Sequence, residues 1–222
     1  MQLALFDLDH TLMSGDSDLL FCDTMLSEGL ISSEAAAQSL EIAERYAAGT
    51  ISPPEYCGFF ASIVSGHSVS ELEPIRRRFL HESIRPRIPW AARALLQRHR
   101  ESGDIIVLTT ATSRVVSEFT AADLGVDDYL CTELETVDGQ YTGRTAGELN
   151  MGLGKLRRLR QWIADKGLPE QLLKRTTFYS DSINDLALLS AVGFPIVVDP
   201  DPRLESTALR KGWSLVRLDR RP

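Results

Sequence analysis

The chain has 222 residues, 43% of them hydrophobic and 25% charged, which is an ordinary composition for a soluble globular protein with a sizeable core. Its net charge of −7, from 24 basic and 31 acidic residues, argues against a nucleic acid or an anionic membrane surface as the main partner. The three cysteines lack metal-site spacing, and no segment approaches membrane-spanning length. We therefore expect a cytoplasmic protein with reduced thiols.

The first predicted element is a strand at residues 3–6. This unbroken apolar run is typical of a buried parallel strand. Asp7 and Asp9 follow directly, at the end of the strand where open α/β sheets bind ligands. Two buried carboxylates are costly without a cation, and Mg²⁺ prefers oxygen ligands, so the pattern favours metal-assisted chemistry with a carboxylate nucleophile. The alternative is an Asp-rich turn that merely ends a strand.

Residues 16–83 carry helical periodicity and no convincing strand. Serines and prolines at the expected starts predict about four helices, which would form a small bundle. Pro86 and Pro89 then mark a boundary. We therefore predict a split α/β core, residues 1–14 and 85–222, with a helical cap of residues 15–84 inserted after the first strand, where it could act as a lid.

Beyond the boundary, predicted helices alternate with strands, which indicates a doubly wound parallel sheet in an α/β fold. Asp138-Gly139, at the centre of residues 135–142, predicts a β-hairpin. The predicted strands are 105–108, 129–131, 176–179, 195–198 and 214–218, and the predicted helices are 90–101, 113–124, 153–166, 184–191 and 202–211.

Three polar features follow later strands or open helices. Thr110 and Ala111 lie between a strand and a helix start, where a hydroxyl and free amides could hold phosphate, unless this is simply a helix cap. Lys155 lies at a helix start, where the helix dipole disfavours a cation unless an anion is bound. Asp181, with Asp185 nearby, follows another strand and could complete a metal site or cap the next helix.

Taken together, Asp7-Leu8-Asp9-His10-Thr11, Thr110, Lys155 and the segment from Asp181 to Asp185 resemble the four ordered motifs of the haloacid-dehalogenase (HAD) superfamily. The position of the helical insertion resembles the C1-type cap of subfamily I-B, the phosphoserine-phosphatase-like branch, near a bacterial group that includes histidinol-phosphate phosphatases. The resemblance covers essentially the whole chain and implies a Rossmann-like core.

The resemblance also implies the roles of individual residues. Asp7 would attack phosphorus, and Asp9 would act as general acid and base. Mg²⁺ would be held by Asp7, by the main-chain carbonyl of Asp9 and by Asp181. The phosphoryl oxygens would be bound by Thr110, Ala111 and Lys155. Thr11 and Asp185 would support the loop and the lysine.

The expected substrate is a small phosphomonoester, and the cap must select its alcohol part. The cap carries Asp16, Asp18, Asp23 and Glu28, and carboxylates facing the site would favour a cationic group. Asp16 is preferred because it lies nine positions after Asp7. This favours histidinol phosphate, with phosphoserine or a broad range of substrates as alternatives. A phosphate-binding regulatory protein without turnover is the competing class, and the oligomeric state is not indicated.

Overall fold

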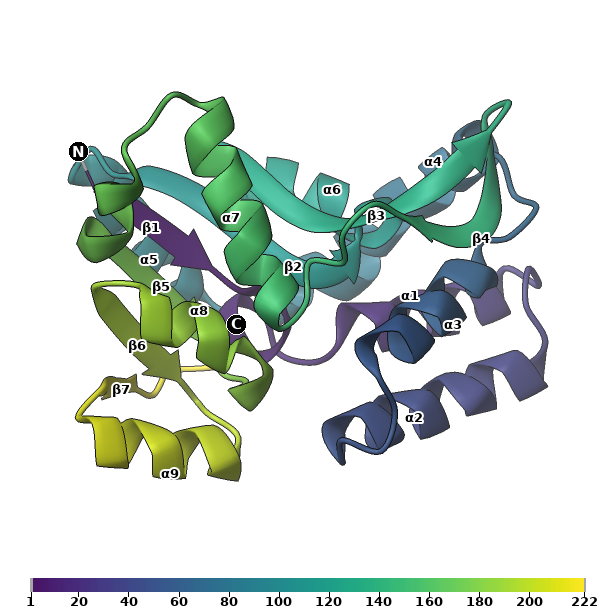
Figure 1. Cartoon of the computed structure of the whole chain (residues 1–222). Coiled ribbons are helices and arrows are strands. Elements are labelled where there is room, and N and C mark those ends of the chain that lie inside the picture. Colours follow the sequence, from purple (N-terminus) through teal and green to yellow (C-terminus); the bar gives the residue numbers. More distant parts are fainter. Residues whose placement is uncertain (1, 222) are drawn as a thin grey trace.

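The computed structural model describes residues 2–221 and contains a seven-stranded sheet in the order β4-β3-β2-β1-β5-β6-β7 (Figure 1). β1 lies in the middle and is parallel to β2 and β5. The chain winds to one side through β2 and β3 and later to the other through β5, β6 and β7, which confirms the doubly wound prediction. The strands are β1 Leu3–Phe6, β2 Ile105–Ser113, β3 Asp128–Val137, β4 Gln140–Ala146, β5 Thr176–Ser180, β6 Phe194–Val198 and β7 Ser214–Val216.

Helices cover both faces of the sheet. Four further helices lie earlier in the chain, within the segment 16–83 that was predicted to be helical. Ser32, Ser52 and Ser68 each cap one of these four by accepting a hydrogen bond from a backbone amide three residues on. No helix within residues 2–221 combines the length and apolar character needed to cross a membrane. The helices are α1 Ser17–Ser27, α2 Ser33–Ala47, α3 Pro53–Ile63, α4 Val69–Phe79, α5 Trp90–Glu101, α6 Arg114–Leu124, α7 Leu153–Asp165, α8 Leu186–Ala191 and α9 Pro202–Lys211.

The central strand β1 is buried on both faces, as its apolar run predicts. Leu3 and Leu5 pack into a cluster with residues of α7, α8 and α9. Ala4 and Phe6 point to the opposite face, where the cluster includes residues of α5 and α6. The strand is thus clamped between two layers, which fixes the position of the loop that follows it.

Two strands extend further than their hydrophobicity predicts. β2 continues from Leu108 to Ser113, because Ser113 pairs with Thr132 after a register shift that begins at Thr109. β3 runs on into a hairpin with antiparallel β4, whose turn residues Asp138 and Gly139 have φ of 51° and 77°. The sheet is therefore mixed at one edge, and its parallel part bears the polar loops.

The segment 16–83 packs against this edge of the sheet. The amide of Gly66 donates to the carbonyl of Tyr141, and the Tyr141 amide donates to the carbonyl of His67. Arg76 on α4 is buried and donates to the backbone of α6 at Val115. A single apolar cluster also joins the four helices to the sheet. The division into a core domain and a cap domain remains a prediction.

Candidate active site

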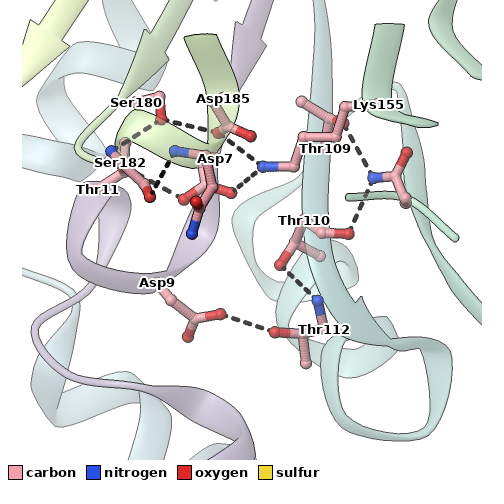
Figure 2. A network of polar contacts seen from close by, with 12 residues as sticks. Asp7, Asp9, Thr11, Thr109, Thr110, Thr112, Lys155, Ser180, Ser182 and Asp185 are labelled. Carbon is pink, nitrogen blue, oxygen red and sulfur yellow. Dashed lines mark hydrogen bonds and ion pairs between the residues drawn. The ribbon is translucent and has the colours of Figure 1, made fainter. Parts of the chain in front are cut away.

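Asp7, directly after β1, lies at the centre of a buried network of charges (Figure 2). Lys155, from the first turn of α7, donates to Asp7 Oδ1 at 2.7 Å and to Asp185 Oδ2 at 2.8 Å. Ser180 at the end of β5 also donates to Asp185 Oδ2, at 2.8 Å. Burial alone would lower the pKa of Lys155, but the two carboxylates outweigh it and raise that pKa. The lysine is therefore held as a cation against Asp7.

A second carboxylate approaches Asp7 from the end of β5. The Thr11 hydroxyl donates to Asp181 Oδ1 at 3.0 Å and lies 3.5 Å from Asp7 Oδ2, and the Asp181 amide donates to Thr11 Oγ1. Burial, partly offset by Lys155, raises the pKa of Asp7 to about 7. Burial and the neighbouring Asp7 raise the pKa of Asp181 well above its usual range. The two carboxylates thus repel each other in a site with a single buried ammonium.

The residues around Asp7 suit a divalent cation. Asp7 and Asp181 are hard oxygen donors brought together on one hydroxyl, and burial raises the pKa of both, so a bound cation would favour their charged forms. Within residues 2–221, no three His, Cys, Asp or Glu side chains form a complete metal cluster. The predicted ligand set, in which the third protein ligand is the main-chain carbonyl of Asp9, stays a prediction.

The raised pKa values predict a stability that depends on pH and on metal. Asp7 and Asp181 bind protons more tightly in the folded than in the unfolded protein, so unfolding free energy should fall as pH rises from about 4 to 8. In EDTA we expect a loss of about 2–4 kcal/mol between pH 5.5 and 8, measured by thermal unfolding. Mg²⁺ should restore stability at pH 8 and have little effect at pH 5.5.

A matched pair of variants tests the origin of this dependence. Asp181→Asn should make the pH dependence in EDTA smaller, because it removes one of the buried carboxylates whose pKa is raised. Asp23→Asn should leave it unchanged, since Asp23 is exposed on α1. A wild-type protein equally stable at both pH values in EDTA would contradict this account of the site.

Asp9 points away from Asp7 and is held by a separate set of hydrogen bonds, as Figure 2 shows for its contact with Thr112. The Thr112 hydroxyl donates to Asp9 Oδ2 at 2.7 Å, and the Ser17 amide donates to Asp9 Oδ1 at 2.7 Å. The hydroxyls of Ser17 and Thr112 lie 3.1 Å apart. With Thr112 donating to Asp9, Ser17 donates to Thr112, so both hydroxyls orient the carboxylate. Thr112 is not among the site residues that the sequence predicts.

The predicted phosphate-binding residues lie at the end of β2 at different depths. Ala111 lines the cavity beside Asp7 and Asp9, whereas Thr110 is fully buried and accepts a hydrogen bond from the Thr112 amide at 3.2 Å. Asn150 stabilises this turn, because its side-chain amide group donates to the main-chain carbonyls of Thr110 and Leu130. Phosphate binding by Thr110 thus remains a prediction, and at this end of β2 it is Thr112, not Thr110, that lines the cavity.

The cavity above these groups has a volume of about 550 Å³ and is walled on one side by α1, α2 and α3. Asp16 caps α1 by accepting from the Leu19 amide at 3.0 Å, and it lines the cavity as the sequence predicted. Burial and the nearby Asp9 raise its pKa to about 7. Asp18 also lines the cavity, whereas Asp23 and Glu28 face outward.

A residue near the C-terminus also supports the loop that follows β1. Arg220 donates to the main-chain carbonyls of His10 and Thr11, and its Nε donates to Asp199 at 2.9 Å. His10 has φ of 57°, so the loop turns sharply directly after Asp9. Arg220 could not be predicted as part of the site, since no motif or periodicity in the sequence links it to the first loop.

Comparison with known proteins gives a consistent picture. Residues 4–190 match the family model described as haloacid dehalogenase-like hydrolase. A histidinol-phosphatase of Neisseria meningitidis serogroup C is 36% identical, over 96% of this chain and 97% of that protein. The phosphoserine phosphatase SerB1 of Mycobacterium tuberculosis is 34% identical, over 96% of this chain and 69% of that protein. A crystal structure of a Bordetella pertussis protein of unknown function has a TM-score of 0.90 and 36% identity, covering 97% of both chains.

Proposed function

The chain belongs to the haloacid dehalogenase-like hydrolase family and is a phosphatase of that family, and we propose that it hydrolyses a small phosphomonoester through an aspartyl-phosphate intermediate on Asp7. The observation that carries the proposal is the buried Asp7 carboxylate, held 2.7 Å from the Lys155 ammonium at the floor of a cavity that Asp9 also lines. A nucleophile, a cation and an acid–base group are thus within one site.

In the first proposed step, an oxygen of Asp7 attacks phosphorus and the bond from phosphorus to the alcohol oxygen breaks. Lys155, placed against Asp7, binds the phosphoryl oxygens as charge moves onto them. Asp9 protonates the departing alcohol. Its carboxylate is held by Thr112 and Ser17 on the side of the cavity that carries Asp16 and Asp18, where the alcohol part would lie.

In the second step, Asp9 removes a proton from water, the water oxygen attacks phosphorus, and the bond between phosphorus and Asp7 breaks to release phosphate. Asp185 and Ser180 keep Lys155 in place throughout. Asp7, Asp181 and the carbonyl of Asp9 would hold Mg²⁺, which when bound supplies positive charge against the phosphoryl oxygens. We also propose that residues 15–84 act as the cap that closes over the substrate.

Histidinol phosphate is the substrate that we favour. The cavity wall contributed by the cap carries Asp16 and Asp18, which suits an amine. Phosphoserine would in addition need a basic group for its carboxylate. Arg203 at the start of α9 lines the cavity and could provide one, which keeps phosphoserine as the second candidate.

The three buried free thiols suit a reducing compartment such as the cytoplasm.

Phosphate release tests the proposed reaction and ranks its substrates. With Mg²⁺ we expect steady release from p-nitrophenyl phosphate, abolished by EDTA and restored by added Mg²⁺. Among histidinol phosphate, phosphoserine and several sugar and nucleotide monophosphates, kcat/KM should be highest for histidinol phosphate. A higher value for phosphoserine would reverse the ranking, and a sugar phosphate at the top would remove the argument for a cationic substrate. No turnover on the whole panel would favour a phosphate-binding protein.

A further inference from the structure

We infer that Asp18, together with Tyr56 and Tyr46, forms a subsite that binds a protonated amine on the alcohol part of the substrate. The inference rests on the proposed phosphatase function and deepens it. The buried carboxylate of Asp18 on α1 would then select the substrate. Position in the sequence alone favours Asp16 for this role. The subsite lies on α1, α2 and α3, which gather beyond the carboxyl end of β1 (Figure 1).

Asp18 is a buried carboxylate that lines the cavity without a cationic partner. Asp18 is only 6% exposed, and it lines the cavity above Asp7. Its one hydrogen bond within residues 2–221 comes from the Tyr56 hydroxyl to Oδ2 at 3.4 Å, and no described residue forms an ion pair with it. A buried carboxylate with a single long, neutral hydrogen bond is costly. A cationic ligand entering the cavity would supply the missing partner.

The groups packed around Asp18 are neutral or negative. Asp16 and Asp9 are the nearby carboxylates, and burial together with Asp18 raises the pKa of the Cys22 and Cys57 thiols to about 12. These thiols are therefore uncharged at neutral pH. Burial and the neighbouring carboxylates raise the pKa of Asp18 well above its usual range, and an ammonium is the class of group that would stabilise its charged form.

Aromatic rings complete the subsite on the side of α2 and α3. Tyr46 and Tyr56 both line the cavity, with ring centroids 4.7 Å apart and planes tilted by 41°. The faces of aromatic rings attract cations, and they also pack against an imidazole or an alkyl chain. A carboxylate bonded to Tyr56, with Tyr46 packed against that ring in the same cavity wall, suits an organic ammonium better than a metal ion, which would need more oxygen donors.

The subsite lies on the correct side of the reaction centre. Asp9, Asp16 and Asp18 line the same cavity, and Asp9 accepts a hydrogen bond from the amide of Ser17, the residue between Asp16 and Asp18. Asp9 is the proposed proton donor to the alcohol oxygen, so the alcohol part leaves toward Asp16 and Asp18. Asp16 is engaged as the cap of α1, since its Oδ1 accepts from Leu19. Asp18 does not cap the helix and is bonded only by the long hydrogen bond from Tyr56 among residues 2–221, which makes it the better partner for an amine.

The test compares two small substrates of similar size, phosphoethanolamine with an ammonium and propyl phosphate without one. In Asp18→Asn, the ratio of kcat/KM for phosphoethanolamine to that for propyl phosphate should fall by about 10- to 100-fold, because a hydrogen bond between two charged groups is lost. Tyr56→Phe should lower the ratio by a smaller factor. Asp23→Asn, a matched change on the exposed side of α1, should leave the ratio unchanged.

The outcomes separate this inference from the proposed function. A folded Asp18→Asn protein with an unchanged ratio would overturn the subsite while leaving phosphatase activity intact, whereas absence of phosphate release from every substrate in the wild type would reject both. Thermal unfolding checks the fold of each variant. Should Asp18→Asn not fold, histidinol should inhibit the wild type at least about tenfold more strongly than N-acetylhistidinol, whose amine is uncharged. Equal inhibition would count against the subsite.

Discussion

Replacement of Asp7 by Asn should abolish turnover, with a loss of at least about 10⁴-fold in kcat. The change keeps the shape of the side chain and removes the oxygen nucleophile that lies 2.7 Å from Lys155. The fold should survive, because burial already raises the pKa of Asp7 to about 7 and a neutral side chain suits the buried position. Steady-state phosphate release and thermal unfolding in EDTA measure the two effects.

Asp9→Asn provides the contrast. Proton transfer contributes about 10²–10⁴-fold, but Asp7 can still attack an aryl phosphate, whose leaving group needs little protonation. The phosphorylated protein should therefore accumulate in Asp9→Asn and be absent from Asp7→Asn, as seen by intact-protein mass spectrometry after acid quench. Near-wild-type activity of Asp7→Asn, or a phosphorylated Asp7→Asn protein, would show that another residue is the nucleophile.

The part of this site that the sequence predicts follows from strand topology. Asp7 and Asp181 come directly after strands that are neighbours in the sheet, with Phe6 aligned to Tyr179. Because the carboxyl ends of parallel strands share one edge, hydrophobic runs followed by aspartates were sufficient to bring these carboxylates together. Lys155 was predicted from a helix start, and its two carboxylate partners are what offset the unfavourable helix dipole there.

The remaining features depend on side-chain directions that no periodicity encodes. The bond from Tyr56 to Asp18 joins two helices across 38 positions, and it depends on how α1 and α3 face each other. Thr112 reaches Asp9 because β2 continues past its apolar run to Ser113, and those last residues are held by pairing and not by hydrophobicity. Local sequence patterns therefore located the groups that we propose to react, whereas the groups that orient them arise from tertiary packing.

Replacement of Lys155 by Met should lower kcat/KM by about 10³-fold, because it removes the ammonium proposed to stabilise charge on the phosphoryl oxygens. It should also destabilise the protein. Lys155 is 3% exposed and bridges Asp7 and Asp185, and breaking a buried ion pair from one side costs about 3–5 kcal/mol. Lys174→Met, a matched change at an exposed site, should alter neither activity nor stability.

The pH dependence and a second substitution distinguish the two roles of Lys155. Without the ammonium, the pKa of Asp7 rises above about 7, so Asp7 is protonated at pH 5.5 and charged only at higher pH. The loss of stability in Lys155→Met should therefore be small at pH 5.5 and large at pH 9, measured in EDTA. Adding Asp185→Asn should recover stability, because one unpaired carboxylate is removed, but should not recover turnover. A double variant that regains activity would mean that Lys155 acts only by neutralising Asp185, and a stability loss independent of pH would mean that its packing matters more than its charge.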